Sequence, residues 1–497
     1  MRSLRRAAAV GAIAAAAIGG LVASQIGAAA APGVSGARSA KAAEKSAWTD
    51  SIGNKVEFSS PAFGMDGKTP IIAVGSYSGY VYVVNAATGQ EMPGWPRPAI
   101  MFKGDQPSAI ESSPAIANLD GPNKPPSIIV GVGSLSVPNQ NGGLIAWHMD
   151  GKVRFVFHTL KRVQPGATQY DSEVFATPAV GPLQGPGSMD IVFGSYDRFM
   201  YALTKNGYLL HGFPVNRADT IWSSAALVDP NGSGHDDIIM GGDATGGRFY
   251  HCIGGWIVNY GYDNKTREPV INWQHCMGQS IWSSPAIGYL SNTSKQLALV
   301  VGASWNHVYE TNPATKELFA YYVKSGKRVP GWPVKTVGAS FGSPAIVHLL
   351  PGRPPVVVTT DCAGCGEAVA QEWTGGGKPL WTSILSDKYE VLGSPVVANV
   401  DGGYIQNVLV GITTGLQVIE GDSPKVIETI DSACRMANSP AVFQLPQPTK
   451  KFPSGWGVAL ACTFRGAHLT TYPIPAPKNP PQWPQWRGNA AKTGYIP

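Results

Sequence analysis

Short apolar runs alternate with turn-forming residues along almost the whole chain after residue 50. A typical unit has an apolar run, a polar gap of Asp, Asn, Gly or Pro, and a second apolar run that ends in glycine. The second runs are clearest at residues 127–131, 190–194, 237–241, 298–302 and 408–411. Short runs of β-branched and aromatic residues between turn formers predict β-strands. Sustained 3.6-residue periodicity is missing after residue 31, so we expect few helices.

A small-small-proline phrase opens each unit and returns eight times. Its third position is proline in seven copies and alanine in one, and successive copies are 45 to 64 residues apart. The third positions are Pro61, Pro114, Pro178, Ala225, Pro285, Pro344, Pro395 and Pro440. A repeat of this length built from short strands predicts an all-β fold, an eight-bladed β-propeller with four antiparallel strands per blade. We expect residues 50–57 or the segment 483–495 to supply the last strand of the ring.

The first 31 residues differ from the rest. Arg2, Arg5 and Arg6 precede an apolar run over residues 7–23, and small residues follow at 28–31. This order predicts a secretory signal peptide at 1–31, and a retained membrane anchor is the alternative. Residues 32–50 then form a flexible tether and residues 51–497 a single propeller domain. The mature chain is expected to be secreted and to have no membrane span.

The charge balance excludes nucleic acid as a partner. Without the leader, Lys and Arg fall from 38 to 35 against 32 Asp and Glu, so the net charge is about +3 rather than +6. Basic residues form no block longer than a pair outside the leader, whereas nucleic-acid binding needs a basic stripe.

Six cysteines in an exported chain predict disulfide bonds. Spacing favours three bridges between near neighbours. These are Cys252–Cys276, Cys362–Cys365 and Cys434–Cys462. Copper ligation by His251-Cys252 and His275-Cys276 is the alternative for the first pair.

Several phrases resemble those of known propeller repeats. Residues 85–89 lead to Trp95, residues 263–266 lead to Trp273, and residues 375–380 lead to Trp381, which is similar to the docking pattern of the quinoprotein-alcohol-dehydrogenase-like (PQQ-like) repeat. Gly-aromatic-Pro phrases end units 1, 3 and 5, and residues 483–494 resemble another PQQ-like segment. The resemblance covers roughly residues 50–497, and it implies that these tryptophans pack between blades as spacers.

The same resemblance raises the question of pyrroloquinoline quinone. Enzymes of the PQQ-like family hold this cofactor with calcium, a stacking tryptophan and usually a disulfide between adjacent cysteines. This chain has no adjacent cysteines, and a Glu/Asn/Asp calcium cage cannot be placed on its positions. Dependence on pyrroloquinoline quinone is therefore disfavoured.

One loop resembles the calcium loop of the FG-GAP repeat. Its oxygen-bearing positions follow the pattern D-x-N-x-S-G-x-x-D, with His235 offering its carbonyl. The candidate Ca²⁺ ligands are Asp229, Asn231, Ser233, His235 and Asp237. Calcium takes six to eight oxygen ligands from such loops. An Asp/Asn/Gly turn without a metal is the alternative.

Equivalent positions in the repeats predict a site on the propeller axis. The residue before each small-small pair should lie at the mouth of the central channel, where aromatic and charged side chains would converge. The candidate ligand-binding residues at this position are Glu111, Phe175, Trp222, Trp282 and Phe341, and Glu173 and Arg435 join them from three residues before the pair. Aromatic platforms beside carboxylates and an arginine suit a glycan or another small polar ligand. A hydrophobic plug of the channel is the alternative.

Two function classes follow from this site. We favour a secreted binding or scaffold protein that recognises a glycan, a cell-wall component, a small polar ligand or a protein partner. The alternative is an enzyme on the same platform, either a quinoprotein-like dehydrogenase or a polysaccharide lyase. Binding is favoured because spacing assembles no catalytic triad, metal-ligand cluster or cofactor cage.

Overall fold

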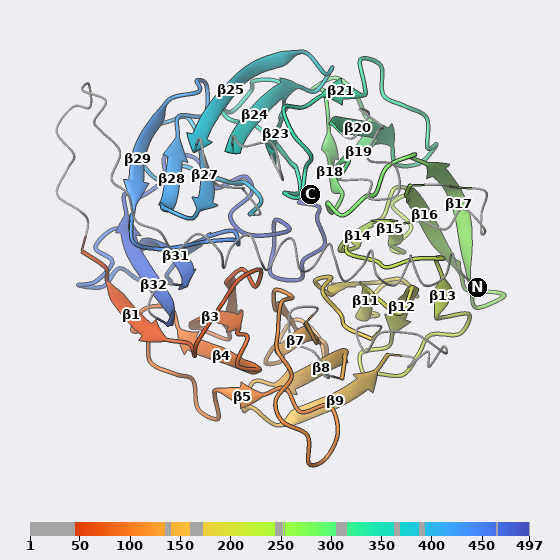
Figure 1. Cartoon of the computed structure of the whole chain (residues 1–497), viewed down its shortest axis with the longest axis horizontal. Helices are drawn as coiled ribbons and strands as arrows, with labels where there is room; N and C mark the ends of the chain where they lie inside the picture. Colours follow the sequence, from red (N-terminus) through yellow and green to blue (C-terminus); the bar gives the residue numbers. More distant parts are fainter. Residues whose placement is uncertain are drawn as a thin grey trace, which may run out of the picture.

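The computed structural model describes residues 45–134, 141–159, 172–243, 252, 254–304, 316–361, 368–386, 393–463 and 466–496. Every regular element in these residues is a β-strand, and the strands form eight four-stranded antiparallel sheets around one axis (Figure 1). The predicted all-β, eight-bladed propeller is confirmed. Within the same residues, we find no helix with the length and apolar character needed to cross a membrane.

In the first four blades the strands follow chain order from the axis outwards. Blade 1 comprises β2 (Ala62–Asp66), β3 (Thr69–Gly75), β4 (Tyr80–Asn85) and β5 (Arg97–Pro98). Blade 2 comprises β6 (Ala115–Ala117), β7 (Ser127–Val132), β8 (Gly143–His148) and β9 (Val153–His158). Blade 3 comprises β10 (Ala179–Gly181), β11 (Asp190–Gly194), β12 (Phe199–Leu203) and β13 (Val215–Asn216). Blade 4 comprises β14 (Ala226–Val228), β15 (Asp237–Gly242), β16 (Trp256–Asp263) and β17 (Glu268–Cys276).

Blades 5 to 7 repeat this order, and blade 8 departs from it at its outer strand. Blade 5 comprises β18 (Ala286–Tyr289), β19 (Leu297–Gly302), β20 (Glu317–Tyr322) and β21 (Val334–Lys335). Blade 6 comprises β22 (Ala345–Val347), β23 (Val356–Asp361), β24 (Ala368–Thr374) and β25 (Pro379–Ser386). Blade 7 comprises β26 (Val396–Ala398), β27 (Asn407–Ile412), β28 (Gly415–Ile419) and β29 (Val426–Ile430). Blade 8 comprises β30 (Ala441–Gln444), β31 (Trp456–Thr463), β32 (Ala467–Ile474) and β1 (Trp48–Ser51).

The hydrophobic core lies between the blades. Ile71 of β3 packs in one buried cluster with Ile128 of β7 in blade 2, whereas its neighbour Ile72 packs in another with Ala459 of β31 in blade 8. Successive side chains of a strand point to opposite faces, so each blade buries both faces against its neighbours. This is why the second strand of each repeat is a continuous apolar run rather than an alternating one.

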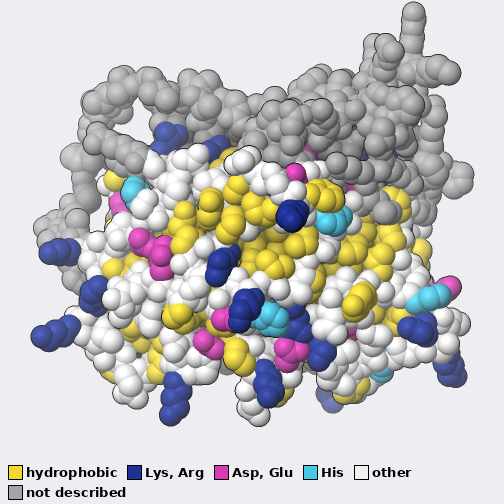
Figure 2. All heavy atoms as spheres, turned by 90° about the horizontal axis from the view of Figure 1, so that it is seen from below, with side chains coloured by type: hydrophobic (Ala, Val, Ile, Leu, Met, Phe, Trp, Pro, Cys, Tyr) yellow, Lys and Arg dark blue, Asp and Glu magenta, His cyan; other side chains and the backbone are white. Residues whose placement is uncertain are grey.

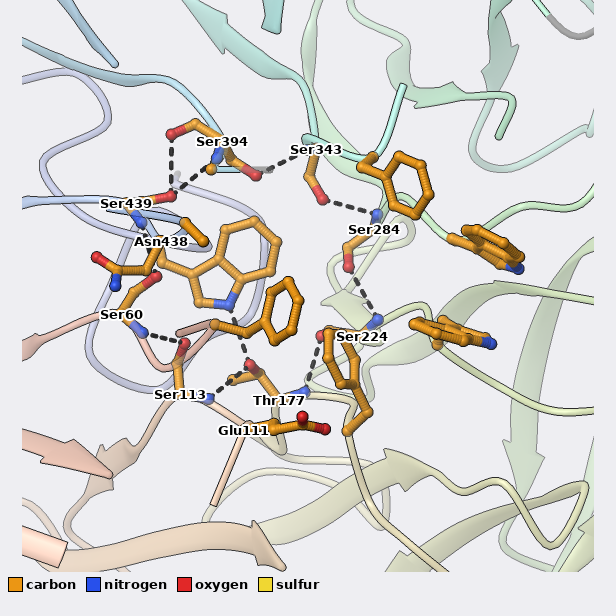
Figure 3. Close-up of a pocket in the computed structure, with 18 residues that line it drawn as sticks. Ser60, Glu111, Ser113, Thr177, Ser224, Ser284, Ser343, Ser394, Asn438 and Ser439 are labelled. Carbon is orange, nitrogen blue, oxygen red and sulfur yellow. Dashed lines mark hydrogen bonds between the residues drawn. The ribbon is translucent and has the colours of Figure 1, made fainter. Parts of the chain in front are cut away.

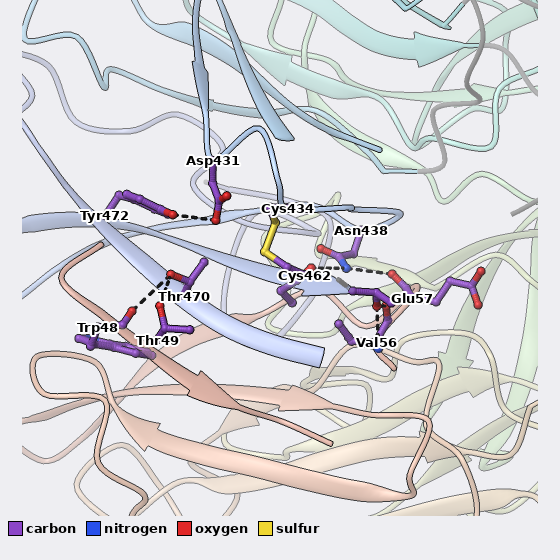
Figure 4. The surroundings of a disulfide bond; sticks show 12 residues. Trp48, Thr49, Val56, Glu57, Asp431, Cys434, Asn438, Cys462, Thr470 and Tyr472 are labelled. Carbon is purple, nitrogen blue, oxygen red and sulfur yellow. Dashed lines mark hydrogen bonds between the residues drawn. A yellow bond between two sulfur atoms is a disulfide. The ribbon is translucent and has the colours of Figure 1, made fainter. Parts of the chain in front are cut away.

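The ring closes through the N-terminal strand (Figure 4). β1 pairs antiparallel with β32 as the outer strand of blade 8, with Trp48 opposite Thr471. Nearby, the Val56 N–H donates to Thr463 Oγ1 over 3.0 Å. The strand that closes the ring thus spans Trp48–Ser51, and it overlaps the start of the predicted closing segment 50–57.

Two of the three predicted disulfides are confirmed. Cys252–Cys276 joins a loop to the end of β17 with a Cα–Cα separation of 5.2 Å, and Cys434–Cys462 joins the approach to blade 8 to β31 with 4.9 Å (Figure 4). Both separations lie in the usual range for disulfides. Cys362 and Cys365 lie outside the described residues, as do the predicted signal peptide and the tether up to residue 44.

Tryptophans bridge adjacent blades as the resemblance implied. The indole N–H of Trp95 donates to the Met149 carbonyl in blade 2 over 2.9 Å. The indole N–H of Trp273 in blade 4 donates to the carbonyl of Val323, next to β20 of blade 5, over 2.7 Å. The Trp95 ring is buried and the Trp273 ring is partly buried, and each indole gives its polar N–H a partner in the next blade.

The C-terminal segment fills the channel instead of supplying a strand of the ring. Residues 483–494 pass from blade to blade around the axis (Figure 1) and form hydrogen bonds with the inner strands of seven of the eight blades. The inner-strand N–H groups that donate to this segment belong to Val397, Val442, Phe63, Ile116, Val180, Leu227 and Ile287. The segment thereby satisfies backbone donors that would otherwise face the axis.

Candidate functional site

A closed ring of hydrogen bonds surrounds the channel (Figure 3). The backbone N–H of the second residue in each small-small pair donates to the side-chain hydroxyl at the same position in the next blade, over 2.7 to 3.2 Å. The eight members, in order round the ring, are Ser60, Ser113, Thr177, Ser224, Ser284, Ser343, Ser394 and Ser439. The repeated phrase therefore joins every blade to the next at the axis.

The first residue of the pair ties each blade to itself. The Ser59 hydroxyl accepts from the Gly75 N–H at the end of β3 over 2.9 Å, and similar bonds recur in other blades. A Cβ atom at Gly75 would lie 2.3 Å from Ile110 Cγ2 of the next blade, so only glycine fits at this interface. In blade 6 the two positions are exchanged: Gly342 replaces the serine, and Thr360 replaces the glycine, with Thr360 Oγ1 2.0 Å from where a Cβ at 342 would lie.

Aromatic side chains form a continuous arc at the mouth of the channel. They occupy the position before the small-small pairs in blades 1, 3, 4, 5 and 6, and neighbouring rings have centroids 4.8 to 5.1 Å apart. The arc runs through Phe58, Phe175, Trp222, Trp282 and Phe341. Tyr196, which the sequence did not point to, lies 5.0 Å from Trp222 with its ring tilted by 45°.

The arc and the hydroxyl ring enclose a cavity of about 70 Å³ on the axis. Trp486 of the C-terminal segment also lines it and donates its indole N–H to Thr177 Oγ1 over 3.0 Å. The volume is enough for a few water molecules or one small ligand group.

Glu111 is the only acidic residue among the described residues that line this cavity. Its Oε1 accepts hydrogen bonds from the Tyr77 hydroxyl and, over 2.8 Å, from the Ser134 hydroxyl. The side chain is 3% exposed, and burial raises the pKa of its carboxyl to about 7 against the lowering effect of these two hydrogen bonds. Beside it, Lys55 lies 2.6 Å from Glu57 and over the Tyr77 ring.

Two further buried carboxyls stand directly behind the arc. Both oxygens of Asp243 lie 2.9 Å from the indole nitrogen of Trp282, whose N–H they accept. Asp361 at the end of β23 accepts from the hydroxyl of Ser340, next to Phe341. Burial raises the pKa of Asp361 to about 7, and burial together with Asp219 raises that of Asp243. Both aspartates come at the end of the second apolar run, a position that could have revealed them.

The structure gathers five of the seven predicted ligand residues around the cavity. These are Glu111, Phe175, Trp222, Trp282 and Phe341. Glu173 lies beside the cavity rather than on it, with its Oε2 accepting from the Ser172 N–H over 3.1 Å. Arg435 is also off the cavity, next to Cys434, where its carbonyl accepts from the Thr463 N–H. The two predicted residues that lie three positions before the small-small pair therefore do not line the cavity.

The predicted calcium loop lies between β14 and β15. The Asp229 carboxylate accepts hydrogen bonds from the N–H groups of Asn231 and Gly234 and from the Ser233 hydroxyl. Asp237 Oδ2 instead accepts from the side-chain amides of Asn259 and Asn272 in blade 4, and the His235 ring lies 3.3 Å from the Leu183 carbonyl. These hydrogen bonds make the loop an Asp turn. Calcium binding by this loop stays a prediction.

Comparison with known proteins supports the fold alone. The sequence matches no protein-family model and no curated protein. Among solved structures, the chain is similar to BamB from Moraxella catarrhalis, with a TM-score of 0.51, 12% identity, and coverage of 86% of this chain and 99% of that one. It is also similar to Sqt1 from Saccharomyces cerevisiae, with a TM-score of 0.56, 9% identity, and coverage of 87% and 100%. The PQQ-like and FG-GAP assignments stay predictions.

Proposed function

We propose that this protein is an exported binding propeller that holds a ligand at the mouth of its central channel. The ligand is a small polar molecule, a glycan or a group presented by a protein partner. The observation that carries the proposal is the axial cavity, which combines an arc of aromatic rings with the Glu111 carboxyl. Ligand sites commonly join apolar walls to a few placed polar groups.

A purely structural plug explains the aromatic arc but not the acid. Apolar side chains alone would fill the centre of the ring. Glu111 is only 3% exposed, and such burial disfavours the charged form of its carboxyl, so a plug has no need of this residue. Glu111 also has hydroxyl partners on two other segments, Tyr77 and Ser134, which hold it in place. Such a supported carboxyl is expected where it recognises a ligand.

Export is proposed from the leader-like sequence and from the disulfides. Two disulfides join described cysteines, and such bonds persist in oxidising compartments outside the cytosol. Mass spectrometry of the protein recovered from the culture medium tests the cleavage after the leader.

The binding proposal is tested by truncating the aromatic arc. Trp282→Ala should weaken binding of any hit from a glycan array or a small-ligand screen by about fivefold or more. Tyr208→Ala, at a side chain that is 72% exposed in blade 3, is the matched control and should change nothing. A lower melting temperature with unchanged binding would show that the arc is only a plug.

A further inference from the structure

Acidic groups surround the mouth of the channel on several blades. Glu57, Glu111, Asp243 and Asp361 are all at most 5% exposed. Glu111 lines the cavity, and Glu57 comes directly before Phe58 of the arc in the chain. Asp243 accepts from Trp282, and Asp361 accepts from Ser340, the residue before Phe341. None of the described residues that line the cavity is Lys, Arg or His. Lys55 is the cation that pairs with this group, through Glu57. Two buried cations of the C-terminal segment lie behind the cavity: Arg487 donates to the carbonyls of Pro285 and Ala225, and Lys492 donates to that of Trp486. The wall of the cavity itself carries one acidic side chain and no basic one among the described residues.

The aromatic rings add a negative potential of their own. Trp222 and Trp282 stack at 4.8 Å, and Phe341 lies 4.9 Å from Trp282. The face of an aromatic ring attracts cations, most strongly for tryptophan and when the cation is desolvated. Because Trp282 donates its N–H to the Asp243 carboxyl, its indole is polarised towards a more negative ring.

We propose that the group recognised in this cavity is an organic ammonium ion, held by the aromatic arc and by Glu111. This inference rests on the proposed function and names the chemistry of its ligand. Ca²⁺ would need six or more oxygen ligands, whereas the arc offers aromatic rings and the cavity wall a single carboxyl. An anion would meet like charge at Glu111. A methylated ammonium group is a cation with an apolar surface, and its size suits a cavity of about 70 Å³.

Binding of a cation here is linked to pH. The carboxyl of Glu111 faces the Tyr77 and Ser134 hydroxyls, with Glu57 and Lys55 nearby, and burial raises its pKa to about 7. A bound ammonium ion favours the ionised carboxylate, so binding releases a proton at neutral pH. Affinity should therefore rise about tenfold between pH 6 and pH 8.

The decisive measurement compares two ligands of the same shape on the full chain. Choline and its uncharged isostere 3,3-dimethyl-1-butanol are titrated by calorimetry at pH 8. We expect choline to bind about tenfold or more tightly. Equal affinity would overturn the ammonium assignment and leave a ligand site at the mouth. Binding of neither compound would also overturn it, while the glycan and small-ligand screens judge the proposed function separately.

A conservative variant tests the part played by Glu111. Glu111→Gln keeps the size of the side chain and an oxygen for Tyr77 and Ser134, so it should fold. It should weaken choline binding, flatten its pH dependence and leave 3,3-dimethyl-1-butanol unaffected. Unchanged choline affinity with a preserved pH dependence would refute the role of Glu111. Tyr208→Ala serves again as the control for general effects of substitution.

Discussion

Replacing Lys492 by methionine should remove a contribution to stability that depends on pH. Lys492 lies in the C-terminal segment, is fully buried, and donates from Nζ to Gln485 Oε1 over 3.2 Å and to the Trp486 carbonyl over 3.1 Å. Its ammonium forms no ion pair with a described carboxylate. Burial, together with the nearby positive charge of Arg487, lowers the pKa of Lys492 to about 7.

The sign and size of the effect follow from linkage. Between pH 7 and pH 10.5 the unfolded chain binds a proton at Lys492 that the folded chain does not, so stability rises with pH in this window. From pH 7 to pH 9.5 the wild type should gain about 3 kcal/mol relative to Lys492→Met. Below pH 7 the difference between the two proteins should be constant.

Urea unfolding followed by tryptophan fluorescence measures this difference at several pH values. Lys450→Met, at an exposed side chain, is the control and should run parallel to the wild type. If the curves of wild type and Lys492→Met are also parallel from pH 7 to pH 9.5, then Lys492 keeps its proton in the folded protein and the reasoning is wrong.

Three other substitutions test the closure of the ring and the buried acids. Ser284→Ala removes the acceptor of the buried Ser224 N–H and should lower the unfolding free energy by about 1–3 kcal/mol. Ser284→Thr should keep the bond, as Thr177 does in its blade. Equal urea midpoints for the two variants would contradict this role. Trp48→Ala should lower the unfolding free energy by about 3–5 kcal/mol, because the indole is 7% exposed and joins β1 to blade 1. A decrease below about 1 kcal/mol in urea unfolding would show that β1 does not close the propeller. Burial raises the pKa of Asp361 to about 7, so its contribution to stability is present below pH 4 and is lost as pH rises towards 7. Between these pH values the wild type should lose about 3 kcal/mol of unfolding free energy relative to Asp361→Asn. Melting curves with the same pH dependence for both proteins would contradict this expectation.

The architecture of the chain can be predicted from its amino-acid sequence alone. Strand propensity and the spacing of the small-small-proline phrase are local features, and they suffice to count the blades because each repeat forms one sheet. The bridges Cys252–Cys276 and Cys434–Cys462 also followed from spacing, since both join segments that are near in the chain. The five aromatic and acidic residues of the cavity could also be predicted, because they hold the same position in their repeats and this position faces the axis in every blade.

The contacts that these equivalent positions make depend on how the blades are arranged in space. Small residues are visible in the sequence, but the bond from the Ser224 N–H to the Ser284 hydroxyl joins different blades, and its geometry depends on how the sheets are placed round the ring. The same holds for Asp243 behind Trp282, for Arg435 turned off the cavity, and for the C-terminal segment that fills the channel. The place of Asp243 after the second apolar run is a local feature, but its bond to Trp282 and the bonds of the C-terminal segment join different blades. No local pattern encodes such bonds, because they form only when the ring closes.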